Sequence, residues 1–71
     1  MFTLAEENYL KAIFHLENDH GAGVSTNAIA DKMDTRASSV TDMIQKLADK
    51  KVISYQKYKG ASLTKKGKSI A

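Results

Sequence analysis

The sequence predicts a mainly helical domain that carries one small β-hairpin. Apolar residues recur at spacings of three and four over most of the chain, which is the pattern of helices with one buried face. After Lys51 the spacing shortens to about two, and Gly60 stands in the polar stretch that interrupts this segment, which is typical of a hairpin. With 71 residues, no proline and no internal repeat, the chain has room for a single core, so we expect one domain over residues 1–71.

The first predicted helix covers about residues 4–18. Tyr9, Ile13 and Leu16 lie at spacings of four and three and form a single apolar stripe. Two acidic residues stand in the first turn, where the helix dipole favours negative charge. The composition of residues 18–23, NDHGAG, predicts that a loop follows.

Two shorter helices joined by a turn come next. Ser25 is placed to cap a helix over residues 25–33. Residues 34–36 make a turn, and a second helix follows over about residues 37–50. Its apolar face holds Val40, Met43, Ile44 and Leu47. Two short helices joined by a three-residue turn are the helix-turn-helix pattern.

A hairpin and a last helix complete the expected fold. We expect the hairpin over about residues 52–63, and Thr64 is placed to cap a helix over residues 65–71. The order of helix, helix-turn-helix, hairpin and helix is that of a winged helix-turn-helix domain. In a DNA-binding helix-turn-helix the second helix of the motif enters the major groove.

The outward face of the helix over residues 37–50 is rich in short polar side chains. Most of its polar positions lie about 100° to 200° from Val40 on a helical wheel, opposite the core. Such side chains weaken a helix interior because they compete for backbone hydrogen bonds, but they allow close approach to base edges and phosphates. We therefore expect a DNA-facing surface made of Thr35, Arg36, Ser38, Ser39, Thr41, Asp42 and Gln45.

Helix capping is the alternative explanation for these hydroxyl groups. Thr35, Ser38 and Ser39 all lie near the start of the helix, where a hydroxyl can accept a backbone hydrogen bond. One hydroxyl is enough for a cap, so this explanation leaves the others unaccounted for.

Charge is distributed unevenly along the chain. The formal net charge is +3, but residues 1–34 hold six acidic and two basic residues, whereas residues 35–71 hold nine basic and two acidic ones. A basic half is expected of a protein that binds a polyanion. In the hairpin we expect Lys57 and Lys59 to lie along the adjacent DNA backbone or the minor groove. For Tyr55 we expect packing against the domain, and a phosphate contact stays open as the alternative.

The sequence offers little for catalysis or metal binding. The chain has no cysteine, no glycine-rich phosphate loop and no paired histidine ligands, so we expect that it is not an enzyme. No apolar run approaches the roughly 20 residues of a membrane span, and the absence of cysteine fits the cytoplasm. A winged helix that binds another protein stays open, and for it exposed aromatic or leucine side chains would be expected beside the hairpin.

Nearly the whole chain resembles a known family. EENYLKAIF, SSVT with the apolar stripe that follows it, YQKYKG and LTKKG are similar to the amino-terminal DNA-binding domain of the diphtheria-toxin-repressor family of iron- and manganese-dependent transcription regulators. The resemblance implies sequence-specific binding of duplex DNA by a metal-dependent repressor. It places Ser38, Ser39 and Thr41 among the family's base and phosphate contacts, and Lys59 at its basic wing position.

The resemblance also implies a longer protein. Family members dimerise and sense Fe²⁺ or Mn²⁺ with the help of a further domain, so it implies a homodimer of the whole protein, and we expect residues 1–71 alone to hold no cofactor. The family's first helix contributes a metal ligand, and the matching position is Asn8, with Glu7 as a reserve. Lys11 stands where manganese sensors have an acidic residue, and an ammonium group is no metal ligand. A DNA-binding regulator that senses a non-metal signal stays open as an alternative.

Overall fold

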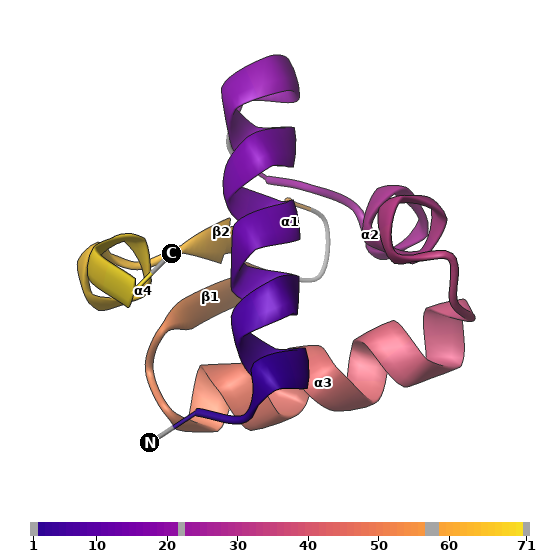
Figure 1. Cartoon of the computed structure of the whole chain (residues 1–71). Helices are drawn as coiled ribbons and strands as arrows, with labels where there is room; N and C mark the ends of the chain where they lie inside the picture. Colours follow the sequence, from indigo (N-terminus) through magenta and orange to yellow (C-terminus); the bar gives the residue numbers. More distant parts are fainter. Residues whose placement is uncertain (1, 22, 57–58, 71) are drawn as a thin grey trace.

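In the part of the chain that the computed structural model describes, residues 2–21, 23–56 and 59–70, four helices accompany one β-hairpin (Figure 1). The elements in chain order are α1 Leu4–His20, α2 Thr26–Met33, α3 Ala37–Asp49, β1 Ile53–Gln56, β2 Gly60–Leu63 and α4 Lys65–Ile70. The mainly helical fold with an antiparallel hairpin confirms the predicted fold class.

Helix α1 is longer than its apolar pattern predicted. It begins after Thr3, whose Oγ1 accepts a hydrogen bond from Glu6 N–H while the Glu6 carboxylate accepts one from Thr3 N–H, which makes a capping box. Residues 18–20 are helical, so the loop predicted to start there is wrong. Polar composition alone does not end a helix. Helix α1 ends at Gly21, whose N–H still bonds to the carbonyl of Glu17 but whose backbone leaves the helix with φ 88°.

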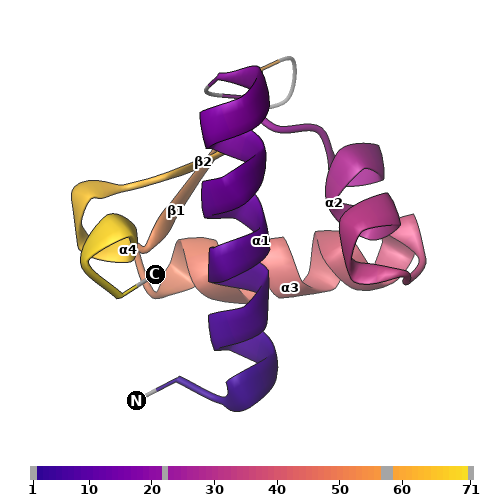
Figure 2. The ribbon, with the colours of Figure 1, turned by 45° about the horizontal axis from the view of Figure 1, so that its top comes forward.

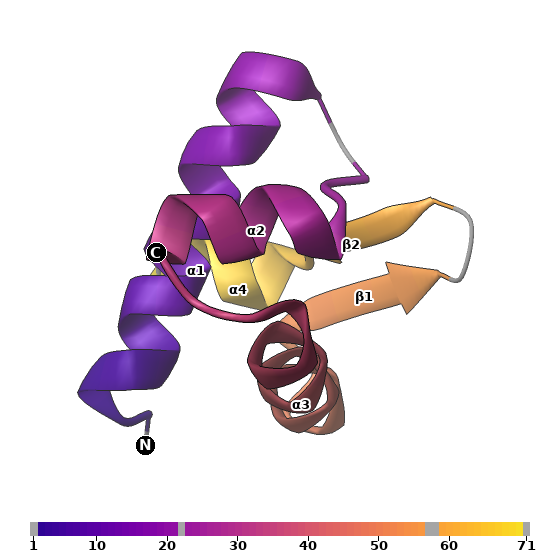
Figure 3. The ribbon, with the colours of Figure 1, turned by 90° about the vertical axis from the view of Figure 1, so that its right-hand side faces the viewer.

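Helices α2 and α3 form the predicted helix-turn-helix. The prediction that Ser25 caps α2 is confirmed, because its Oγ accepts a hydrogen bond from Ala28 N–H at 3.1 Å. Asp34 ends α2 with a left-handed backbone of φ 53°, and Arg36 is the residue from which α3 starts. Helix α3 ends one residue before the predicted boundary, with Lys50 as its C-cap. Figure 3 shows α3 nearly end-on, beneath the turn that follows α2.

The hairpin projects from the side of the helical unit (Figure 3). Strands β1 and β2 pair antiparallel, and Val24 adds a bridge to Ala61 on the other edge of β2. Gly60 opens β2 with φ +80°, and a Cβ built on it would lie 2.4 Å from the carbonyl oxygen of Val24. This position therefore requires glycine, both for its backbone angle and for the close approach of Val24.

The core lies between α1 and the elements that surround it. In Figure 2, α1 passes in front of α3, with α2 on one side and the hairpin and α4 on the other. The core side chains are Tyr9, Leu10, Ile13, Leu16, Val24, Ile29, Ala30, Val40, Ile44, Leu47, Val52, Ile53, Ala61 and Leu63. Residues from each predicted apolar stripe meet in this single core. Their burial determines which side of α3 faces solvent.

Short polar contacts attach the last elements to the core. The prediction that Thr64 caps α4 is confirmed by a hydrogen bond from Gly67 N–H to the Thr64 Oγ1 at 3.1 Å. The carboxylate of Glu17 accepts a hydrogen bond from Leu63 N–H and so joins α1 to β2. Among the described residues, none of the helices combines the length and the apolar character that a membrane crossing requires.

Candidate nucleic-acid interface

The outward face of α3 carries the polar residues that the sequence analysis predicted for the DNA-facing surface. Val40, Ile44 and Leu47 are buried on one side of the helix, so the opposite side faces solvent. The exposed polar residues there and at the entrance to the helix are Thr35, Arg36, Ser38, Ser39, Thr41, Asp42, Gln45, Lys46 and Asp49. Small side chains at the amino end leave the helix backbone open to close approach by a ligand.

The amino end of α3 has no side-chain cap. Arg36 occupies the N-cap position, and its side chain makes no capping hydrogen bond. In the described part of the chain, none of Thr35, Ser38 and Ser39 accepts a hydrogen bond at this helix end, which removes the capping alternative. The first N–H groups of α3 are thus open to an external acceptor, and the helix dipole favours one that carries negative charge.

Thr41 lies one turn further along the exposed face. Its Oγ1 donates a hydrogen bond to the carbonyl of Ala37 at 3.1 Å, which fixes the side chain against its own helix. The hydroxyl oxygen keeps lone pairs that can accept a hydrogen bond, and the methyl group is available for an apolar contact. This arrangement can serve a contact with a base amino group or a thymine methyl.

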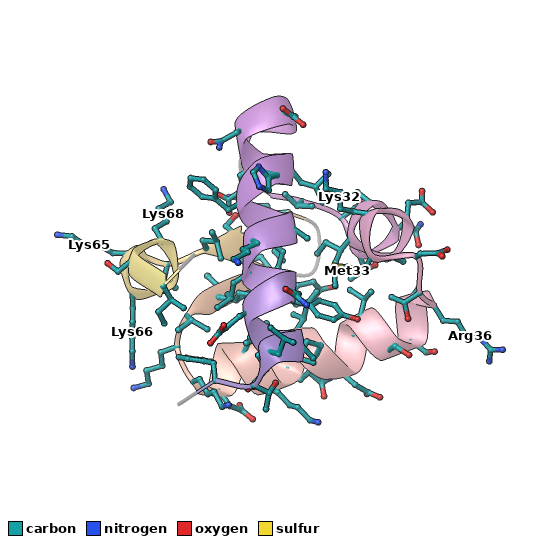
Figure 4. The ribbon with its side chains drawn as sticks, viewed as in Figure 1. Lys32, Met33, Arg36, Lys65, Lys66 and Lys68 are labelled. Carbon is teal, nitrogen blue, oxygen red and sulfur yellow. The ribbon has the colours of Figure 1, made fainter. Side chains whose placement is uncertain are left out.

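Among the described residues, the basic side chains of the second half of the chain are spread over α3 and its ends, the hairpin and α4. Figure 4 shows Arg36 pointing into solvent at the entrance to α3. In the same view Lys65, Lys66 and Lys68 spread from α4 on the opposite side of the molecule. The basic residues of α4 therefore lie apart from the hydroxyl face of α3, whereas Arg36 adjoins that face.

The hairpin places Lys59 at the edge of an open recess. Lys59 is exposed, and its N–H bonds to the carbonyl of Gln56 at 3.1 Å. The open recess is lined by Gly23, Ser54, Gln56, Lys59, Gly60 and Ser62. Lys57, the other hairpin lysine that we expect to contact DNA, lies outside the described residues.

The polar side chains of this recess were missed by the sequence analysis. Ser54 and Gln56 are two positions apart on β1, and Ser54 pairs with Ser62 of β2. Side chains at such positions share one face of a hairpin. The alternation of the strands was therefore a pattern from which this set could have been found.

Tyr55 does not pack as expected. It lies on β1 opposite Ala61 in the strand register, yet 47% of the residue is exposed. Its register partner Ala61 is buried, and so is Ile53 on the same face of β1. The prediction of a packing role is therefore wrong for about half of its surface, and the phenol is accessible to a ligand of the hairpin.

The metal positions implied by the resemblance do not form a site for a transition metal. Asn8 and Lys11 are exposed one turn apart on α1, and Glu7 beside them is half-buried. Within the described residues, no group of three or more His, Cys, Asp or Glu side chains is placed to hold an ion. An amide oxygen is a poor ligand for iron and an ammonium group is none, so these residues do not fit Fe²⁺ and offer Mn²⁺ too few ligands.

Similarity to known proteins agrees with this geometry. Residues 1–61 match the family described as "Iron dependent repressor, N-terminal DNA binding domain". The HTH-type transcriptional regulator MntR of Oceanobacillus iheyensis is 41% identical over 70 residues, which are 99% of this chain and 47% of that protein. The MntR proteins of Bacillus velezensis and Bacillus subtilis are each 42% identical over 71 residues, 99% of this chain and 49% of theirs.

The chain spans about half the length of these curated relatives. The match is to a DNA-binding domain of transcription regulators, which confirms the expectation that the chain is not an enzyme. The family match covers the helix-turn-helix completely and reaches into the second strand of the hairpin. The chain therefore belongs to the iron-dependent repressor family, whose amino-terminal DNA-binding domain it carries.

Proposed function

We propose that this domain reads a specific sequence of duplex DNA by inserting the amino end of α3 into the major groove. This proposal rests on two features of the amino end of α3: it has no side-chain cap, and it carries exposed hydroxyl side chains. The free N–H groups and Arg36 bind phosphate, while Ser38, Thr41 and Gln45 meet base edges. Asp42 selects a cytosine by accepting a hydrogen bond from its exocyclic amino group.

The hairpin supplies the second contact with the same DNA. Lys59 and the open recess beside it follow the backbone next to the major groove, where a lysine neutralises one phosphate without reading sequence. The helix thus determines which sequence is bound, and the hairpin adds affinity for any sequence.

For the whole protein we propose a metal-dependent repressor that acts in the cytoplasm. Its relatives are described as transcriptional regulators, and the family model as an iron-dependent repressor. Two copies bind as a homodimer through residues outside this chain, and they occupy half-sites about 34 Å apart, or a multiple of that distance. The ligands that hold Fe²⁺ or Mn²⁺ then come mainly from outside residues 1–71, because Asn8 and Lys11 are poor ligands for either ion.

The direct test is selection of duplexes from a random library, followed by anisotropy titrations at several salt concentrations. A selected duplex should bind more tightly than a scrambled duplex of the same composition. Both affinities should fall with salt, with a slope of log K against log salt of about 0.9 for each phosphate neutralised. Equal affinity for the two duplexes would contradict sequence reading, and affinity that is independent of salt would contradict binding to DNA through its phosphates.

A further inference from the structure

Lys50 and Glu6 join two elements that are far apart in the sequence. The Nζ of Lys50, the C-cap of α3, lies 2.6 Å from Oε2 of Glu6 in the first turn of α1. The same Nζ lies 4.9 Å from the centre of the Phe2 ring, within the range of a cation–π contact. One ammonium group thus holds the carboxyl end of the recognition helix against the start of α1.

The Glu6 carboxylate has a second partner besides Lys50. Oε1 of Glu6 accepts a hydrogen bond from Thr3 N–H at 2.8 Å, and Oε2 is left for Lys50. The Glu6 side chain is only 6% exposed, and Glu6 is the one charged residue classed as buried within the described residues. The hydrogen bond from Lys50 and that from Thr3 hold the pKa of the Glu6 carboxyl below its usual range. A buried carboxylate needs such partners, which makes the contact a directional constraint.

The apolar stripe of α3 does not by itself supply such a constraint. Val40, Ile44 and Leu47 determine which face is buried, and the hydrophobic effect that buries them is non-directional. Helix α3 has 13 residues and spans about 20 Å at 1.5 Å per residue. A shift at its carboxyl end therefore changes where its amino end presents the hydroxyl side chains.

Lys50 takes part in an ion pair within the domain, whereas Lys46 on the same helix does not among the described residues. Lys46 is exposed one turn earlier on α3, and it has no ion-pair partner among the described residues. A lysine at the end of a recognition helix would ordinarily be counted as a phosphate contact. The Lys50 side chain is 41% exposed, but its Nζ is paired with the Glu6 carboxylate at 2.6 Å.

We propose that Glu6 and Lys50 are positioning residues, which set the orientation of α3 for reading DNA, and that Lys50 does not neutralise a phosphate. The proposal rests on DNA binding as proposed above. An experiment can distinguish the positioning role of the pair from a phosphate contact by Lys50. Loss of the pair should weaken binding to the selected duplex without changing the salt slope, whereas loss of a phosphate contact lowers the slope by about one.

Three substitutions isolate the pair. Glu6→Gln keeps an acceptor for Thr3 N–H, because glutamine also completes a capping box, but removes the charge that faces Lys50. Lys50→Met keeps most of the aliphatic stem, and Lys50→Arg keeps the charge. Lys46→Met is the matched control on the same helix. Circular dichroism identifies a temperature at which all variants are folded, and the titrations are made there.

We expect Glu6→Gln and Lys50→Met to weaken binding of the selected duplex by roughly two- to thirtyfold, at an unchanged salt slope. The double variant Glu6→Gln/Lys50→Met should lose no more than either single variant, and Lys50→Arg should bind the selected duplex like the parent chain. Lys46→Met should lower the salt slope by about one. A lowered slope for Lys50→Met, or normal affinity for Glu6→Gln, would overturn the proposal.

Amide chemical shifts of the free chain give a readout that needs no DNA. Glu6→Gln and Lys50→Met should move the resonances of residues 38–45 in the same way, because both release the same end of α3. If the parent chain binds no duplex, the proposed function fails, and these shifts still decide whether the pair positions α3. Unchanged resonances over residues 38–45 in both variants would overturn the positioning role.

Discussion

Replacing Thr41 with alanine should stabilise the domain and weaken its reading of DNA. Thr41 is exposed, and its only described hydrogen bond runs to its own helix at the carbonyl of Ala37, so the change leaves no cavity. Alanine is the better helix former by about 0.5 kcal/mol, and a threonine bond to the preceding turn adds little to helix stability. In a domain of this size the gain corresponds to a rise in Tm of about 2–4 °C.

The same change should reduce affinity for the selected duplex. Loss of one good base contact costs about 1–3 kcal/mol, which is about five- to 150-fold in Kd. Thr41→Ser keeps the hydroxyl and Thr41→Val keeps the methyl group, so the two variants show which part of the side chain reads the base. Thermal unfolding and anisotropy titrations measure the two effects separately. The reasoning fails if Thr41→Ala lowers Tm, and equal weakening of the selected and scrambled duplexes would make Thr41 a phosphate contact.

Four further outcomes follow from the structure. Lys59→Ala should weaken binding to all duplexes alike and lower the salt slope by about one, and a change in sequence preference would contradict this. Gly60→Ala should lower Tm, because it adds a Cβ 2.4 Å from a carbonyl oxygen at a positive φ, and an unchanged Tm would show that the hairpin yields. Calorimetry with Mn²⁺ and Fe²⁺ should show no binding below the millimolar range, whereas micromolar binding abolished by Asn8→Ala or Glu7→Ala would reverse the conclusion about α1. Because the Glu6 pKa is lower in the folded chain, Glu6 contributes stability above its ordinary pKa that is lost as the pH falls through the lowered value. The difference in Tm between the parent and Glu6→Gln should therefore shrink on acidification, and a constant difference would refute the linkage.

Periodicity predicted the elements and the faces they bury, because burial of one stripe is what selects those residues. Val40, Ile44 and Leu47 repeat at the helical spacing, and all three are buried in α3. The exposed polar face of α3 follows from the same geometry. The end of α1 was not predictable from polarity, since it depends on the backbone at Gly21 rather than on its polar neighbours.

Contacts between distant parts of the chain were beyond sequence reasoning. Nothing in the local pattern around Glu6 indicates that its partner is Lys50, 44 residues away. Alternation places Tyr55 on the same face of β1 as the buried Ile53, so the exposure of Tyr55 was not predictable from the strand pattern. The separation of the basic residues of α4 from the hydroxyl face of α3 likewise depends on how the helices are arranged (Figure 4).

The claim that α3 and the hairpin form the DNA-binding surface is tested most directly by amide chemical-shift mapping. The isotopically labelled chain is titrated with the selected duplex and, as a control, with the scrambled one. We predict that the selected duplex shifts the amides of residues 35–45 and of Lys59, and that the exposed side of α1 around Asn8 and Lys11 stays unchanged. Shifts concentrated on α1 or α4, with residues 35–45 unaffected, would contradict the account.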